Sequence, residues 1–119
     1  MKLINYLIIQ IIPFLPKVFV RLVASPYIAG ITDDEMLLNV QKLNNKGYDV
    51  AIDILGEHVK TEQEATEITE RYANLYDRIA SQKLNANLSI KLSHIGQDLG
   101  YDFVKSCLLY TSDAADECS

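Results

Sequence analysis

The chain has 119 residues, of which 49% are hydrophobic and 23% are charged, a mixture typical of globular proteins. This composition excludes a disordered tail, a collagen-like repeat and, at this length, a multi-domain protein. Sixteen acidic residues against 11 lysines and arginines give a net charge of −5. No strongly basic surface is therefore available for a phosphate backbone, and we expect no nucleic-acid partner.

The first sixteen residues form an apolar stretch, MKLINYLIIQIIPFLP, which two polar residues interrupt and which Pro13 and Pro16 break. It is shorter than the about 20 apolar residues that a membrane-spanning helix needs. We expect a short amphipathic helix packed on a domain, with a peripheral membrane contact or a signal segment as the alternatives. A second short helix is expected over residues 17–24, ending near Pro26.

Two Thr-x-x-Glu capping boxes, which begin at Thr32 and Thr61, predict two helix starts. The first box should open a helix that stops at Gly47, and the second a long helix that runs to about Gln82. Apolar residues recur in the long helix at spacings of three and four, which is typical of one buried face. The predicted buried stripe consists of Ala65, Ile68, Tyr72, Leu75 and Ile79.

Two short segments rich in branched residues, 48–55 (YDVAIDIL) and 86–92 (ANLSIKL), predict two strands. The long helix between them predicts a parallel β-α-β unit. A further helix should begin near Tyr101. The leading helices and the β-α-β unit predict the α/β class. Because a two-stranded parallel sheet cannot bury both of its faces, we expect this to be the opening part of a larger protein.

The C-terminal residues differ in origin from the rest in our interpretation. Residues 107–117 read CLLYTSDAADE, which resembles the translated read-through of a transposon-based sequencing adapter. We predict that residues 1–106 are native and that 107–119 are a non-native tail; a genuine acidic tail is the alternative. Without the tail the net charge is −2 and no cysteine remains, which excludes a disulfide, a thiolate metal site and a cysteine nucleophile from the native part.

Alternation along the two strands places charged residues on one face of the sheet. Asp53 and Lys91 lie on the face opposite the apolar side chains, and Glu57 follows the first strand. Because a lysine is almost never fully buried without a partner, this cluster at the carboxyl ends is either a functional site or a structural ion pair with a solvent-reaching lysine. His58 and His94 form no metal-ligand motif, and we interpret them as solvated or hydrogen-bonded loop residues.

Three separated segments resemble the monofunctional bacterial proline dehydrogenases: PYIAGIT (26–32), GYDVAIDILGEHVKTEQEA (47–65) and NLSIKLSHIGQDLG (87–100). That family has an equivalent leading helix, a first strand ending in an Asp-x-Leu-Gly-Glu-like motif and a second strand with a Ser-x-Lys-Leu core. The resemblance covers about residues 13–106. It implies the N-terminal part of a (β/α)8 TIM barrel that moves a hydride from C5 of L-proline to FAD, forms 1-pyrroline-5-carboxylate and passes electrons to quinone.

The resemblance also implies site residues. Lys91 matches the family's active-site lysine beside flavin and substrate, which gives it catalytic, substrate-binding and cofactor-binding roles. Glu57 matches the acid that pairs with a lid arginine over the proline, and Asp53 matches the inner acid of the first strand, in a supporting place. Strands three to eight of such a barrel, with most flavin and proline contacts, are missing, so we expect the chain alone to be inactive. The implied location is cytoplasmic, with peripheral contact to the inner membrane face.

The residues alone are also compatible with two other functions. A Schiff-base aldolase built on a barrel would use Lys91 as its nucleophile, which requires a lysine whose pKa is lowered. A non-catalytic β-α-β interaction module would instead need a stable sheet with a protected edge. A flavin absorbance band that bleaches with proline would separate the oxidoreductase from both.

Overall fold

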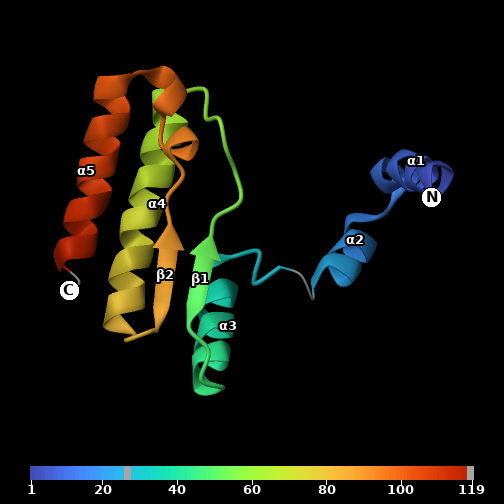
Figure 1. Cartoon of the computed structure of the whole chain (residues 1–119), viewed down its shortest axis with the longest axis horizontal. Helices are drawn as coiled ribbons and strands as arrows, with labels where there is room; N and C mark the ends of the chain where they lie inside the picture. Colours follow the sequence, from blue (N-terminus) through green and yellow to red (C-terminus); the bar gives the residue numbers. More distant parts are fainter. Residues whose placement is uncertain (26–27, 118–119) are drawn as a thin grey trace. The chain divides into compact units, whose positions relative to one another are not determined.

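The computed structural model describes residues 1–25 and 28–117 (Figure 1). The chain divides into two compact units, residues 1–36 and 37–119, which we describe separately. The order of α-helices and strands is the predicted one: three helices, a strand, a helix, a strand and a helix, with short 3₁₀ turns between them. The α/β class is therefore confirmed.

The first unit contains helix α1 (Lys2–Ile11), a 3₁₀ turn η1 (Ile12–Phe14) and helix α2 (Lys17–Ala24). Both predicted helices are present, and no side chain of either is buried. The expected packing of the first helix on a domain stays a prediction, and the expected end of the second helix at Pro26 lies outside the described residues. Among the residues that the structure describes, no helix combines the length and apolar character needed to cross a bilayer.

Helices α3 (Asp33–Asn45) and α4 (Glu62–Ser81) begin at the two predicted capping boxes. The Thr61 hydroxyl accepts a hydrogen bond from the N–H of Glu64 at 3.2 Å, and the Glu64 carboxylate accepts one from the N–H of Lys60 at 3.1 Å. The first box has the same geometry. In both boxes the glutamate carboxylate accepts a hydrogen bond from the backbone N–H of the residue before the N-cap, which ties the incoming chain to the first helical turn.

The end of α3 is joined to the starts of both strands. Gly47 takes the predicted left-handed conformation, with φ +87°, and ends the helix. The Asn44 side chain donates to the carbonyls of Tyr48 at 2.9 Å and Asn85 at 3.0 Å, and its oxygen accepts from the N–H of Asn85 at 2.8 Å. Asn44 thus holds the two strand starts side by side, although Asn85 is 41 positions away.

Strands β1 (Val50–Asp53) and β2 (Ala86–Ser89) form a parallel two-stranded sheet in which Asp53 lies opposite Ser89. Each strand has four residues, fewer than predicted. Pairing ends with Asp53 and Ser89. Three residues beyond β1 the chain reaches Gly56, whose φ of +138° favours glycine. The described residues therefore form a partial α/β fold and do not close into a barrel.

Helix α4 covers one face of the sheet and supplies more core residues to the second unit than any other element does. The hydroxyl of Tyr76 donates to the carbonyl of Leu88 at 3.0 Å and ties α4 to β2. The predicted stripe on α4 is buried as expected, apart from Ile68, which is half-buried. The apolar core residues of this unit are Leu37, Val40, Ile52, Ile54, Ala65, Tyr72, Ala73, Leu75, Ile79, Leu88, Ile95 and Cys107.

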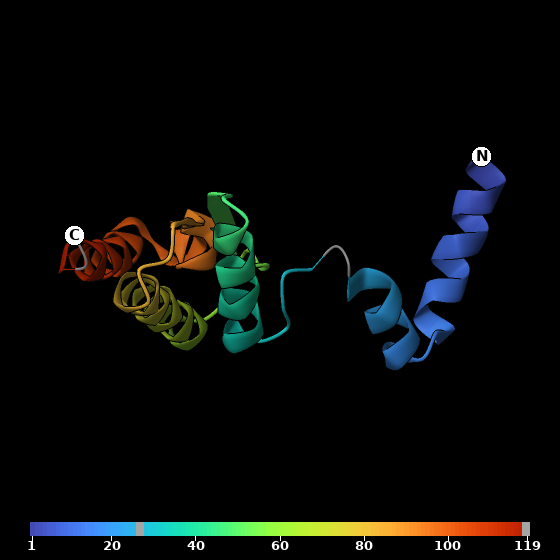
Figure 2. The ribbon, with the colours of Figure 1, turned by 90° about the horizontal axis from the view of Figure 1, so that it is seen from below.

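Helix α5 (Tyr101–Glu117) begins where predicted and packs along α4. Helices α4 and α5 both run opposite to the strands, so α3 is followed by two successive strand–helix pairs (Figures 1 and 2). The helix passes from Ser106 into Cys107 without a break, and Cys107 and Thr111 are buried. No feature of the backbone marks the expected boundary of the tail, so the division after residue 106 stays a prediction.

Candidate functional site

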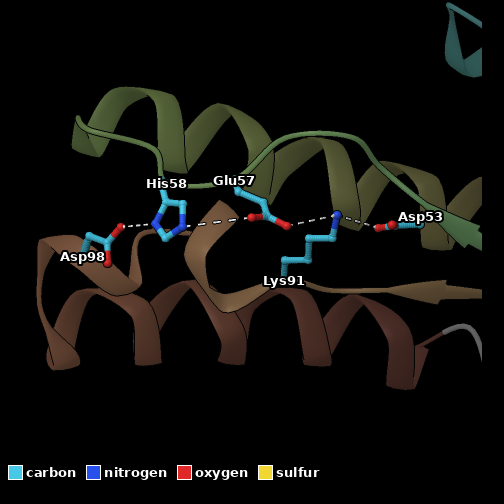
Figure 3. A network of polar contacts seen from close by, with 5 residues as sticks. All are labelled: Asp53, Glu57, His58, Lys91 and Asp98. Atoms are coloured by element: carbon cyan, nitrogen blue, oxygen red, sulfur yellow. Dashed lines mark hydrogen bonds and ion pairs between the residues drawn. The ribbon is translucent and has the colours of Figure 1, made fainter. Parts of the chain in front are cut away.

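The three predicted site residues come together at the carboxyl ends of β1 and β2 (Figure 3). Lys91 Nζ lies 3.2 Å from Asp53 Oδ1 and 3.7 Å from Glu57 Oε1. The Lys91 side chain is 27% exposed, whereas the two carboxylates are 52% and 56% exposed. A half-sheltered ammonium between two accessible carboxylates is therefore the centre of this site.

Strand alternation explains why these side chains meet. Asp53 is the last residue of β1 and pairs with Ser89, so Lys91, two residues further along, projects on the same side. The same alternation predicts that Leu92 joins the apolar face, and this prediction is wrong. Leu92 begins a 3₁₀ turn, η3 (Leu92–His94), and is exposed, because the chain has already left the sheet.

The charge state of Lys91 follows from its neighbours. The hydrogen bond to Asp53 has the largest effect and raises the pKa of the Lys91 ammonium. Desolvation opposes it, and the charges of Asp53 and Glu57 raise the pKa further. The amine is therefore protonated at neutral pH. A Schiff-base nucleophile must be a neutral amine, so this site does not favour the aldolase alternative.

The row of charges continues beyond the predicted residues. His58 Nδ1 lies 2.8 Å from Asp98 Oδ2, and His58 Nε2 lies 4.0 Å from Glu57 Oε2 (Figure 3). Asp98 belongs to the 3₁₀ turn η4 (Gln97–Leu99). His58 is thus the hydrogen-bonded loop residue that the sequence predicts, but Asp98 is an unpredicted member of the cluster. Its participation depends on two loops separated by 40 positions, which leaves no local sequence signal.

His94 corrects a second expectation. It is hydrogen-bonded, as one form of the prediction allowed, but it is only 4% exposed and lies in η3 rather than in an open loop. Its Nδ1 is 3.3 Å from the hydroxyl of Tyr72 on α4. A single histidine after a strand has no periodic neighbours in the sequence, so its burial could not be read from a pattern.

We expect the two histidines to titrate on opposite sides of the usual pKa of histidine. The hydrogen bond to Asp98 raises the pKa of His58, and burial, together with the charges of Lys91 and Arg71, lowers the pKa of His94. His58 therefore contributes stability that is full below about pH 6.5 and is lost as pH rises through its folded pKa. His94 contributes stability that is present above about pH 6.5 and is lost as pH falls through its folded pKa.

NMR titration of the ring resonances measures both values in one experiment. Asp98→Asn should return the pKa of His58 toward its usual range and leave that of His94 in place. Identical titration of the two rings would contradict the contacts of both.

Comparison with known proteins places the chain. No family model matches it. Proline dehydrogenase 1 of Bacillus subtilis (strain 168) is 39% identical over 79 residues, which are 66% of this chain and 26% of the relative. Proline dehydrogenase 2 of Bacillus subtilis subsp. natto is 33% identical over 84 residues, 71% of this chain and 28% of the relative. Over this segment the chain is similar to the proline dehydrogenases.

The predicted resemblance to proline dehydrogenases is thereby confirmed. The chain spans about a quarter of the length of the curated relatives it matches. The roles of Asp53, Glu57 and Lys91 in such an enzyme stay predictions, although the structure brings all three together.

Proposed function

We propose that this chain is part of a proline dehydrogenase that oxidises L-proline to 1-pyrroline-5-carboxylate, and that Asp53, Glu57 and Lys91 line its active site. The observation that carries the proposal is the Lys91 ammonium, held between two carboxylates at the carboxyl ends of two parallel strands. Ligands of α/β proteins bind at this end of the strands, both in barrels and in open sheets. The names of the relatives support proline as the substrate class.

The site is compatible with FAD and with proline. An ammonium has three N–H donors, and the hydrogen bond to Asp53 uses one of them. Glu57, at 3.7 Å, is an ion-pair partner beyond hydrogen-bond distance, so Lys91 retains donors for an acceptor atom of the flavin or for the proline carboxylate. FAD, when bound, would supply the hydride acceptor. Lys91 Nζ would keep its protons throughout, so that it acts by position and charge rather than as a base. Glu57 is exposed enough to pair with an arginine from another part of the enzyme.

A chimaera tests this function. The matching segment of the Bacillus subtilis relative is replaced by the corresponding residues of this chain, and the purified protein is mixed with L-proline. We expect a flavin absorbance band that bleaches with proline and the appearance of 1-pyrroline-5-carboxylate. A folded, flavin-loaded chimaera that proline does not bleach would contradict the proposal. After incubation with an aldehyde or keto acid, a borohydride-trapped adduct on Lys91 without flavin would instead support the aldolase.

We also propose a cytoplasmic enzyme that passes its electrons to a membrane quinone, with the first unit as its peripheral membrane contact. Residues 1–32 contain Lys2, Lys17 and Arg21 and no acidic residue, while α1 and α2 expose their apolar side chains. Basic residues opposite an apolar face are typical of helices that lie on anionic bilayers. Arg21 also lies 3.6 Å from Glu35, but this pair is exposed and holds neither side chain strongly.

Vesicle sedimentation of the chain tests the membrane contact. We expect more binding to vesicles that contain phosphatidylglycerol than to pure phosphatidylcholine, and Leu22→Glu should reduce it because it places a carboxylate on the apolar face of α2. Leu38→Glu, at an exposed leucine of α3, is the matched control and should bind as the parent does. Equal loss in both variants would contradict the assignment. A change of oligomeric state in Leu22→Glu without a lipid effect would show a self-association surface instead.

A further inference from the structure

His94 is a buried polar side chain for which the proposed reaction has no use. It follows Lys91 by three positions, and its backbone N–H donates to the carbonyl of Lys91 at 3.0 Å. Its ring meets the ring of Tyr72 edge to face, with centroids 5.9 Å apart and planes at 87°. Tyr72 is itself completely buried, and its hydroxyl also hydrogen-bonds the backbone of Lys91. His94 and Tyr72 therefore fix the main chain from which the Lys91 side chain starts.

The opposite edge of the His94 ring contacts the loop that carries Glu57. A Cβ on Gly56 would lie 2.5 Å from His94 Nε2, so the ring occupies the space directly beneath the residue before Glu57. The neighbouring backbone is tied to the same turn, since the N–H of Val59 donates to the carbonyl of Ser93 at 3.3 Å. The His94 imidazole thus lies against the main chain beside both Lys91 and Glu57.

We propose that His94 is a positioning residue that sets the distance between the Lys91 ammonium and the Glu57 carboxylate, with Tyr72 as its support. The ring fills the space between α4, η3 and the loop at Gly56, so a smaller side chain would let the loop and Glu57 move relative to Lys91. The catalytic meaning of this spacing rests on the proposed function. The spacing itself can be measured without flavin or proline.

His94 performs this role as a neutral imidazole. Burial and the cations Lys91 and Arg71 lower the pKa of His94, whereas the carboxylates Asp53 and Glu57 oppose this with smaller effects. A protonated ring would add a second cation beside Lys91. A neutral amide of similar length should therefore replace the imidazole better than an apolar side chain, because it can also hydrogen-bond the Tyr72 hydroxyl.

The pKa of Lys91 reports the distance to its carboxylates and is measured in the whole chain by NMR titration of ¹³C-labelled lysine, with Lys91→Arg to assign the signal. His94→Leu should lower the pKa of Lys91 by the part that the Glu57 charge supplies, while the larger effect of the hydrogen bond to Asp53 remains, and His94→Gln should restore most of the parent value. Ile79→Ala is the matched control. It removes a buried side chain elsewhere on α4 and should lower stability while leaving the pKa of Lys91 unchanged.

An unchanged pKa of Lys91 in a folded His94→Leu variant would overturn the proposal and leave His94 as a core residue only. Should that variant not fold, His94→Asn decides, because it shortens the side chain and keeps a neutral amide. A lowered pKa of Lys91 in His94→Asn supports the positioning role, and an unchanged one overturns it. A chimaera that fails to oxidise proline, while Lys91 still responds to His94, would refute the proposed function and not the positioning.

Discussion

Gly56→Ala is expected to lower the free energy of unfolding of the chain by about 2–4 kcal/mol, because the added Cβ brings both backbone strain and a steric clash. The φ of Gly56 is +138°, which L residues rarely adopt. The added Cβ would also lie 2.5 Å from His94 Nε2, closer than van der Waals contact allows. Urea denaturation followed by circular dichroism measures the loss.

Gly100→Ala is the matched control for this prediction. Gly100 has nearly the same conformation, with φ +136°, but a Cβ there meets nothing within 4 Å. It should cost only the backbone strain, about 1–2 kcal/mol. The difference between the two variants then measures the contact with His94, and Gly56→Ala combined with His94→Ala should recover it. Equal losses at the two glycines would show that the ring yields without cost.

Lys91→Met is expected to reduce kcat/KM for proline in the chimaera by about 10²–10³-fold, the range seen when one preorganised donor is removed from an active site. Methionine keeps the length and apolar stem of lysine but cannot hold Asp53, Glu57 or an anionic ligand group. Lys91→Arg should recover part of the rate, because it restores the charge with a different donor geometry. Steady-state assays of soluble, flavin-loaded protein give the comparison.

Lys105→Met, at an exposed lysine of α5, is the control for the loss of one positive charge. It should change kcat/KM by less than about twofold. If Lys91→Met behaved like Lys105→Met, the ion pairs at the strand ends would be structural only. That outcome would favour the alternative that the sequence left open, a structural ion pair with a solvent-reaching lysine.

Those parts of the fold that depend on local signals could be predicted from the sequence. The capping box at Thr61 places a hydroxyl and a carboxylate three residues apart, and the geometry of a helix start then determines their partners. The meeting of Asp53 and Lys91 was also predictable, because it needs only alternation and parallel pairing. The contact of His58 with Asp98 was not, since it depends on how two irregular loops approach each other.

Strand length and the tail show a different limit. The branched residues around β1 suit a strand, but pairing needs a partner at every position, and with two strands it stops once either one turns away. Residues 107–117 continue α5 because leucine and alanine favour a helix whatever the origin of the sequence. Helical structure there does not distinguish a native end from an adapter-derived one.

The three hydrogen bonds of Asn44 have a consequence for how faithfully the strands align. Because side chains alternate along a strand, slippage of β2 by one residue would turn Lys91 toward α4 and bring Leu88 out into water. Four paired residues are a short template for excluding such misalignment. By holding Asn85 beside Tyr48, the Asn44 amide sets the register in which β1 and β2 begin to pair, and this register determines which side of the sheet Lys91 faces. An uncharged side chain far from the ions thus decides whether the lysine faces the carboxylates or the core.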